Sequence, residues 1–272
     1  MLFRSPRGEG IGTRHQLSYY LELAAVFGPV TAGTDYPALV LRDAAAAAGA
    51  LGIHATAGPW LAMAPGAAYG PAKQWPVERF AAVAHWWRAK GGRVAVVGTA
   101  AEREAGEVVE TAVSGTVNLA GHTDLRGLMA VLRTCGTVLA NDSGAMHLGA
   151  ALGCRGVAVF GSTDPVATGP IGGTWILLSD PPGCSPCLRR TCRLKQNQYT
   201  CLARIQVQDA IADQKGQEEV QIPNVDNSIT ITVKNSRGED QGSNPVFAVG
   251  DEIWIEGTNV DSNVAYMWIT GP

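Results

Sequence analysis

The sequence lacks an excess of charge of either sign, and it is poor in charged and aromatic residues. Charged residues make up 17% and aromatic residues 7% of the 272 residues, and the formal net charge is -3. This balance gives no overall positive field, so we expect no nucleic-acid partner, and any polyanion must be bound locally. Hydrophobic residues make up 46% of the chain, a globular composition that excludes low-complexity classes.

Long apolar runs are also missing. The most apolar stretch, residues 44–68, is interrupted by His54, Pro59 and Pro65, whereas a bilayer-spanning helix needs about 20 consecutive apolar residues. We therefore predict no membrane span. Residues 1–12 contain Gly and Arg in place of an apolar segment, so no secretory signal is expected. Six Cys without such a signal predict free thiols in a reducing compartment, which means a cytoplasmic location.

The composition changes abruptly near Asp213. All six Cys and all five His precede Gln214, whereas residues 214–272 carry three cations and nine anions. We predict three parts: residues 1–57, the remnant of an N-terminal domain with a linker; residues 58–213, an α/β domain; and residues 214–272, an acidic β-rich tail that does not belong with the rest.

Within residues 58–213, short apolar strands alternate with helices of 8 to 15 residues. The strands are predicted at 60–64, 93–97, 116–119, 137–140, 156–160 and 175–178. The intervening helices are predicted at 76–90, 101–113, 124–134 and 145–152. This alternation is typical of βαβ units, so we predict an α/β fold: one Rossmann-like parallel sheet with helices on both faces.

The flanking segments follow different patterns. Apolar spacing predicts a helix over 15–28, a second from the cap Asp35 toward Gly52, and a closing helix over 205–213. In the tail, runs of β-branched residues predict strands at 228–233, 246–249, 253–256 and 264–269, with a turn at 235–238.

Ligands of open parallel sheets bind at the carboxyl ends of the strands, and the first distinctive loop there is 65–76. Gly66 and Gly70 allow close approach of the backbone to a ligand, and Lys73 supplies one flexible positive charge. This combination suits a phosphate. The alternative is an ordinary surface loop with a solvated Lys.

The second loop, residues 141–147, precedes a predicted helix. Asp142 or Ser143 can cap that helix, and Gly144 removes side-chain bulk, so that the N–H groups of the first turn face an anion. His147 lies on the same turn and can bond to that anion. The alternative is a capped helix with a half-buried His. Two phosphate-suited loops on one sheet favour a diphosphate ligand, and a third loop, 160–165, suits lining the same cleft or forms only a turn.

Four segments in this order resemble the bacterial ADP-heptose:lipopolysaccharide heptosyltransferases of glycosyltransferase family 9. They read PGAAYGPAKQWP (65–76), NLAG (118–121), NDSGAMH (141–147) and FGSTDP (160–165). The Cys-rich loop that follows is similar to the heptosyltransferase II branch, and the resemblance covers about 14–213. It implies a GT-B fold, in which two Rossmann-like domains flank a cleft, and this chain matches the C-terminal, donor-binding domain.

The resemblance also implies the roles of several residues. Lys73 would contact the diphosphate of ADP-heptose, together with the segment Asp142-Ser143-Gly144 and His147, which would also reach the sugar. Glu102 and residues 121–125 would flank the ribose and the adenine. The implied reaction is transfer of heptose to the lipopolysaccharide inner core with inversion, with no cofactor required. The implied partners are the nucleotide sugar and a lipopolysaccharide core precursor, with peripheral contact to the inner membrane.

The resemblance further implies an N-terminal acceptor domain of roughly 150 residues, of which only the final helices, about 14–52, are matched. An inverting transfer needs a general base, and no residue of this chain is assigned to that role. Asp142, next to a diphosphate, is expected to cap the helix or to bind a sugar hydroxyl. We therefore expect the chain to bind the donor and to turn over weakly or not at all.

A second candidate site is a cluster of four cysteines, Cys184, Cys187, Cys192 and Cys201. Four thiols can hold zinc tetrahedrally and order a loop, so we consider structural zinc. The alternative is reduced or disulfide-paired thiols, since the second pair lacks CxxC spacing. The same loop carries four cations that would either serve an anionic lipid acceptor or remain solvated: Arg189, Arg190, Arg193 and Lys195.

Two hypotheses follow for the whole chain. In the first, it is the donor-binding half of a heptosyltransferase. In the second, the α/β domain is a non-catalytic nucleotide-binding module, and the β-rich tail mediates adhesion or assembly.

Overall fold

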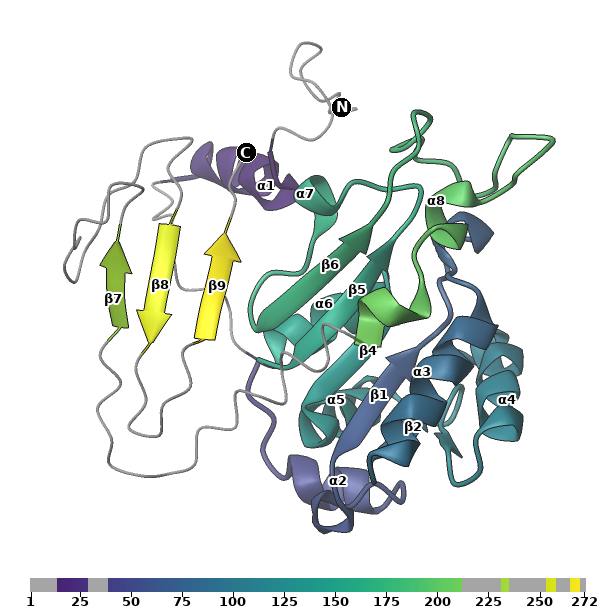
Figure 1. Ribbon diagram of the computed structural model, residues 1–272. Coiled ribbons are helices and arrows are strands. Elements are labelled where there is room, and N and C mark those ends of the chain that lie inside the picture. Colours follow the sequence, from purple (N-terminus) through teal and green to yellow (C-terminus); the bar gives the residue numbers. More distant parts are fainter. Residues whose placement is uncertain (1–13, 29–38, 212–230, 235–252, 258–264, 270–272) are drawn as a thin grey trace. The chain divides into compact units, whose positions relative to one another are not determined.

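A computed structural model of the chain describes residues 14–28, 39–211, 231–234, 253–257 and 265–269 (Figure 1). The chain divides into two compact units, residues 1–219 and 220–272. The predicted boundaries at 57/58 and 213/214 stay predictions. Among the described residues, no helix combines the length and the apolar character needed to cross a membrane.

The larger unit contains a six-stranded sheet with the order β3-β2-β1-β4-β5-β6, and every neighbouring pair is parallel (Figure 1). Its strands are β1 (Trp60–Ala64), β2 (Arg93–Val96), β3 (Val117–Asn118), β4 (Thr137–Asn141), β5 (Arg155–Phe160) and β6 (Thr174–Ser179). All six predicted strands are present, and the predicted Rossmann-like parallel sheet is confirmed.

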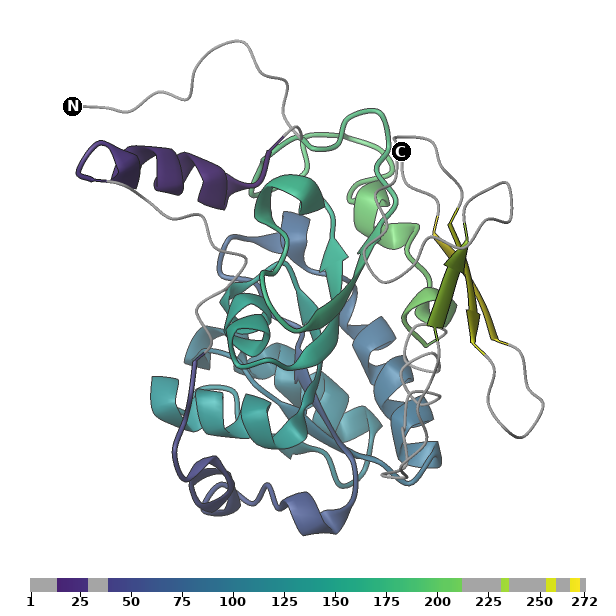
Figure 2. The same ribbon diagram turned by 90° about the vertical axis from the view of Figure 1, so that its left-hand side faces the viewer.

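From β1 onward, helices alternate with these strands, and both faces of the sheet are covered by helices (Figure 2). The structure describes eight complete α-helices in this unit. They are α1 (Gln16–Ala25), α2 (Ala44–Gly49), α3 (Val77–Ala89), α4 (Arg103–Ala112), α5 (Leu125–Cys135), α6 (Gly144–Ala151), α7 (Pro165–Thr168) and α8 (Thr200–Ala203). Three short 3-10 helices are η1 (Ala55–Ala57), η2 (Pro71–Lys73) and η3 (Ala100–Glu102), and a further helical segment covers 207–211.

Two apolar cores lie on the two faces of the sheet, because successive side chains of a strand point in opposite directions. On β1, Leu61 and Met63 belong to the core that includes Phe80 of α3. Ala62 belongs to the other core, together with Val131 of α5. Every residue of β1 and β4 is buried, which explains why these strands read as continuous apolar runs instead of alternating patterns.

The helix predicted from Asp35 toward Gly52 is wrong over residues 39–43, and its first residues, 35–38, lie outside the described residues. The described helix α2 begins only at Ala44. The backbone N–H of Leu39 donates to the carbonyl of Ala151 at 2.8 Å, which holds the chain in a non-helical path beside the end of α6. Asp43 has φ 60°, and this left-handed turn separates that path from the helix.

The strand order places the reversal of the sheet between β1 and β4. In open parallel sheets, ligands bind in the crevice beyond the carboxyl ends of the strands at such a reversal. The loop after β1 and the loop after β4 both begin there, and the loop after β5 is adjacent to them. The fold therefore brings together the three loops that the sequence indicates.

The smaller unit contains an antiparallel sheet of three described strands, in the order β7-β8-β9. These strands are β7 (Ile231–Lys234), β8 (Ile253–Gly257) and β9 (Ala265–Ile269). Three of the predicted tail strands are thus present. The strand predicted at 246–249 and the turn predicted at 235–238 lie outside the described residues.

The close packing of β5 on its neighbours gives a test of the fold. A methyl group at Gly156 would lie 2.6 Å from the carbonyl oxygen of Val138 and 2.7 Å from the ring of Trp175. We expect Gly156→Ala to lower the free energy of unfolding of the larger unit by about 1–3 kcal/mol, because the core must shift to admit it. Urea unfolding followed by circular dichroism at 222 nm measures this change.

The matched control is Gly183→Ala, because a methyl group at Gly183 would meet no atom within 4 Å. We expect the free energy of unfolding of this variant to be within about 0.5 kcal/mol of that of the parent chain. Equal stability of the two variants would contradict the packing described for β5.

Candidate functional site

The loops after β1 and β4 meet through an ion pair. The ammonium of Lys73, at the end of η2, lies 2.6 Å from Oδ2 of Asp142, which directly follows β4. Asp142 is only 4% exposed and Lys73 13% exposed. The structure therefore brings these two predicted site residues into contact, on the same edge of the sheet.

A buried amide fixes the loop that carries Lys73. Asn141, the last residue of β4, is fully buried. Its Oδ1 accepts a hydrogen bond from the backbone N–H of Trp75 at 3.0 Å, and its Nδ2 donates to the carbonyl of Pro65 at 2.6 Å. These bonds hold both ends of the 65–76 loop against β4. In the sequence, Asn141 is recognisable only as an amide at the end of an apolar strand. That pattern does not predict its hydrogen bonds to the 65–76 loop.

The third loop supplies a second donor to Asp142. The hydroxyl of Thr163 donates to Oδ2 of Asp142 at 2.6 Å, and Thr163 is itself buried. The same carboxylate oxygen thus forms the ion pair with Lys73 and accepts the hydrogen bond from Thr163. The sequence pattern indicates only that the 160–165 loop lines the cleft or forms a turn, and it does not predict this contact. A buried carboxylate needs such partners, since burial without them is costly.

The start of α6 is open to a ligand. Ser143 occupies its N-cap position, with φ -150° and ψ 170°, but its side chain makes no capping hydrogen bond. The expectation that Asp142 or Ser143 caps this helix through its side chain is therefore wrong: among the described residues Ser143 makes no capping bond, and Oδ2 of Asp142 binds Lys73 and Thr163. Within the part of the chain that the structure describes, the Oγ of Ser143 is buried without a hydrogen-bond partner, and an added methyl at Gly144 would meet nothing within 4 Å.

His147 is the fourth residue of α6, and its ring is neutral at pH 7. Its pKa lies below the usual 6.5, because partial burial disfavours the charged ring and because Lys73 and His15 add like charge. Asp142 acts in the opposite direction and is outweighed. His147 therefore offers a hydrogen bond to a ligand without offering a positive charge.

A cavity of about 910 Å³ opens beside α6. Ser143, Gly144 and His147 line it, and Glu102 of η3 lines it from the end of β2, whereas Lys73 and Asp142 are not among its lining residues. Residues 121 and 123–125 also line it, as the family resemblance implies for the nucleotide. The structure thus joins four of the six predicted donor-binding residues in one cavity, while Asp142 directly precedes Ser143 and Lys73 is paired with Asp142.

Glu102 has a structural role in addition to its place in the cavity. Its Oε2 accepts hydrogen bonds from the backbone N–H of Thr99 at 2.7 Å and from the Thr99 hydroxyl at 2.9 Å. Its carboxyl group lies over Gly66, where an added methyl would come within 2.3 Å of Oε1. A side chain at position 66 would therefore require the carboxyl group of Glu102 to move.

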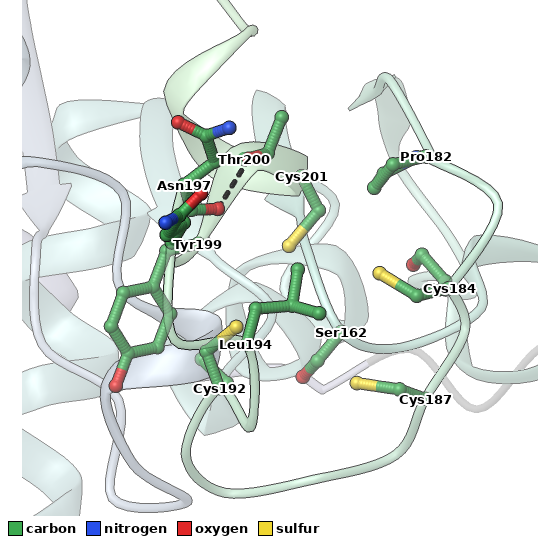
Figure 3. Close-up of a pocket in the computed structure, with 13 residues that line it drawn as sticks. Ser162, Pro182, Cys184, Cys187, Cys192, Leu194, Asn197, Tyr199, Thr200 and Cys201 are labelled. Carbon is green, nitrogen blue, oxygen red and sulfur yellow. Dashed lines mark hydrogen bonds between the residues drawn. The ribbon is translucent and has the colours of Figure 1, made fainter.

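The four clustered cysteines face a second cavity of about 270 Å³ (Figure 3). All four are free thiols. Burial raises the pKa of Cys201, and the nearby Cys187, Cys184 and Cys192 raise it further. Among the residues that the structure describes, no group of His, Cys, Asp and Glu is placed to hold a metal ion. The zinc prediction is therefore not supported, since the thiols line the walls of a cavity instead of closing on one point about 2.3 Å from each sulfur.

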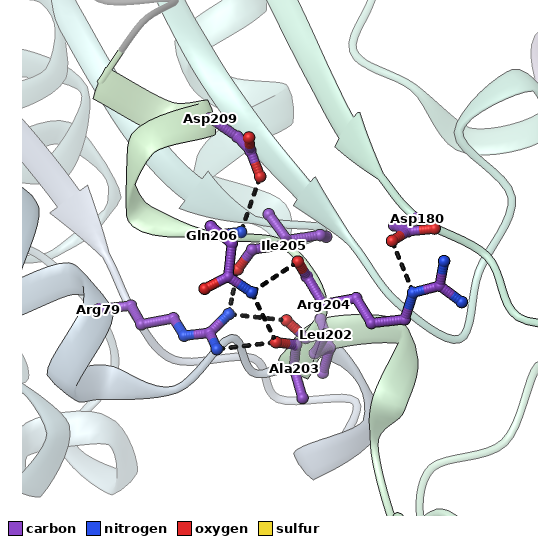
Figure 4. A network of polar contacts seen from close by, with 8 residues as sticks. All are labelled: Arg79, Asp180, Leu202, Ala203, Arg204, Ile205, Gln206 and Asp209. Carbon is purple, nitrogen blue, oxygen red and sulfur yellow. Dashed lines mark hydrogen bonds and ion pairs between the residues drawn. The ribbon is translucent and has the colours of Figure 1, made fainter.

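The end of this Cys-rich loop is anchored on α3 (Figure 4). The guanidinium of Arg79 donates to the carbonyls of Ala203 at 2.7 Å and Leu202 at 3.4 Å, and also to that of Ile205. These are carbonyls at the end of α8, which have no partner within the helix. An ion pair between Arg204 and Asp180, at 2.7 Å, joins the same segment to the beginning of the loop.

The fold and the site define the class of the larger unit: an α/β domain of the nucleotide-binding type, with its ligand loops at the reversal of a parallel sheet. The particular family follows from the sequence. Residues 7–198 match the model of glycosyltransferase family 9 (heptosyltransferase), and the chain belongs to that family.

Individual relatives agree with this assignment. The chain is 36% identical over 118 residues to the lipooligosaccharide heptosyltransferase 2 of Haemophilus influenzae, which is 42% of this chain and 34% of that protein. The lipopolysaccharide heptosyltransferase 2 of Escherichia coli matches with the same identity and coverage. The chain thus aligns with about a third of the length of these relatives.

Solved structures show the same fold. The chain is similar to the E. coli ADP-heptose lipopolysaccharide heptosyltransferase II, with a TM-score of 0.60 and 25% identity, covering 70% of this chain and 57% of that one. A glycosyltransferase family 9 protein from Veillonella parvula has a TM-score of 0.64 at 24% identity, covering 75% of this chain and 60% of that one. The predicted likeness to half of a GT-B glycosyltransferase is confirmed at the level of the fold.

The hydrogen bond from Thr163 to Asp142 can be tested through stability. We expect Thr163→Val to lower the free energy of unfolding by about 1–3 kcal/mol, because a buried carboxylate loses a donor while the volume of the side chain is kept. Urea unfolding of the purified protein measures the change. Thr163→Ser keeps the hydroxyl and should retain most of the stability; a Ser variant as unstable as the Val variant would show that the hydrogen bond is not the cause.

Proposed function

We propose that this chain forms the donor-binding half of a heptosyltransferase and binds ADP-heptose at the reversal of its sheet. The observation that carries the proposal is the convergence, at one edge, of the Lys73 ammonium and the open start of α6. The ammonium contacts Asp142 at 2.6 Å, and the adjacent Ser143 hydroxyl is buried without a partner. A helix start with unoccupied N–H groups and a nearby cation is a general solution for binding phosphate groups.

The parts of the donor are assigned as follows. The diphosphate lies against the backbone N–H groups of Ser143 and Gly144, with Lys73 on one side and the neutral His147 on the other. The ribose and the adenine extend toward Glu102 and residues 121–125, which line the same cavity of about 910 Å³. That volume is within the range of about 300–1,000 Å³ that is usual for small-molecule sites.

The reaction we propose is transfer of heptose from ADP-heptose to the lipopolysaccharide inner core with inversion, without a cofactor. The described residues position the donor, and the general base that activates the acceptor hydroxyl is not assigned. Asp142 is unsuited to that role in the arrangement found, since Lys73 and Thr163 bind its carboxylate. We infer that transfer by this chain is weak or absent.

The proposal places the protein in the cytoplasm, with peripheral contact to the inner membrane, where a lipopolysaccharide core precursor is the acceptor. The free state of all six cysteines supports this placement, because thiols persist in reducing compartments.

Binding of ADP tests the donor site directly. Isothermal titration should detect ADP binding, and Lys73→Ala should weaken it by about 1.5–3 kcal/mol because a charge-assisted hydrogen bond to phosphate is lost. Lys90→Ala, which removes a cation from the far end of α3, is the control and should bind like the parent chain. Unchanged affinity in the Lys73 variant would return Lys73 to the role of an ordinary loop residue.

A transfer assay tests the reaction itself. With ADP-heptose and heptosyl-Kdo2-lipid A, release of ADP should be absent or far slower than for a relative that has both GT-B domains, because no acceptor-activating group is assigned. Mass spectrometry of the lipid measures the transfer. Rates equal to those of such a relative would show that the chain supplies the base itself.

A further inference from the structure

The proposed diphosphate site has little net positive charge. Lys73 is paired with Asp142, so the two groups together contribute no net charge. The low pKa of His147 leaves its ring neutral at pH 7, and Glu102 adds a negative charge to the cavity. A diphosphate ester carries at least two negative charges at neutral pH. A further cation near Lys73 is therefore needed to balance the ligand, because charge is hardly screened in a partly buried site.

The Cys-rich loop brings such a cation to the Lys73 loop. The carbonyl of Arg190 accepts a hydrogen bond from the backbone N–H of Ala72 at 3.1 Å, and the hydroxyl of Tyr69 donates to the carbonyl of Leu188 at 2.7 Å. Gly70 has φ +138°, and an added methyl there would lie 2.7 Å from the Arg190 carbonyl oxygen. The two loops are thus in direct backbone contact, and Arg190 is held beside the residues that precede Lys73.

The side chain of Arg190 reaches the rim of the cavity. Its Nη2 donates to the carbonyl of Ala68 at 3.3 Å, and Ala68 lines the cavity. Its Cζ lies 5.7 Å from the ring centroid of Tyr69, and the ammonium of Lys73 lies 4.8 Å from the same centroid. One aromatic ring therefore attracts both cations and keeps them in the same part of the site.

The guanidinium retains free capacity for a ligand. Among the residues that the structure describes, no carboxylate forms an ion pair with Arg190, and the hydrogen bond from Nη2 to the Ala68 carbonyl uses a single N–H. A guanidinium has five N–H donors in a planar arrangement that matches two phosphate oxygens. Arg190 thus differs from Lys73, whose charge is already paired.

We propose that Arg190 is a second donor-binding residue, which binds the diphosphate together with Lys73, and that Tyr69 positions it. This inference rests on the proposed function. It also gives the Cys-rich loop a role in the site: its backbone carries a guanidinium to the 65–76 loop.

The test is the discrimination between ADP and AMP in isothermal titration of the full chain. We expect Arg190→Gln to weaken ADP binding tenfold or more and AMP binding less than threefold, because the second phosphate loses its guanidinium. Arg190→Lys keeps the charge and loses the planar donor pair, so its affinity for ADP should lie between those of the parent chain and Arg190→Gln. Arg193→Gln is the matched control: it removes an exposed Arg of the same loop and should leave both affinities unchanged.

The positioning role of Tyr69 has its own test. Tyr69→Phe keeps the ring and removes the hydrogen bond to Leu188, so it should weaken ADP binding in the parent chain but have little further effect in the Arg190→Gln background. Additive effects of the two changes would overturn this role. A far-UV spectrum like that of the parent chain shows that each variant is folded.

The outcomes separate this inference from the function on which it rests. No heat with millimolar ADP in the parent chain overturns the proposed function and this inference with it. Binding of ADP by the parent chain with equal affinities for Arg190→Gln and Arg193→Gln overturns the inference alone. Equal losses for ADP and AMP in the Arg190 variant also overturn it, because they place the guanidinium away from the second phosphate.

Discussion

The site depends on one buried carboxylate. Asp142 lies at the end of a fully buried strand, where an ionised group is stable only if it is paired and hydrogen-bonded. Its two partners come from different loops, Lys73 after β1 and Thr163 after β5. Satisfying this charge therefore fixes the relative positions of three loops, and these loops form the edge of the sheet at which a ligand would bind.

The polar groups at this edge fall into two sets. One set is occupied within the protein: the Asn141 amide binds the backbone of the 65–76 loop, and the Thr163 hydroxyl binds Asp142. The other set is not occupied: the Ser143 hydroxyl has no partner, and the start of α6 has no side-chain cap. This separation gives a rigid frame and an open binding surface, which is the arrangement that lets a site bind without reorganisation.

Sequence patterns predict the α/β unit well because its strands are buried on both faces. Continuous apolar runs such as 60–64 and 137–140 predict central strands of a parallel sheet. The sequence patterns give wrong predictions where a contact with a residue far away in the chain determines the backbone conformation. Residues 39–43 have helical spacing, yet the hydrogen bond from Leu39 to Ala151 holds them outside a helix. The four cysteines leave structural zinc and reduced thiols open as alternatives, and the structure places the free thiols around a cavity.

The sequence by itself determined the order of strands and helices along the chain and the three loops at the carboxyl edge of the sheet. It also determined the family to which the chain belongs. Local spacing and composition encode these features, because they depend on neighbouring residues. The tertiary structure alone decided which of the polar residues bind one another: it paired Lys73 with Asp142, gave Thr163 its acceptor and brought Arg190 to the rim of the cavity. These contacts join residues far apart in the chain, so they depend on how the loops fold back over the sheet.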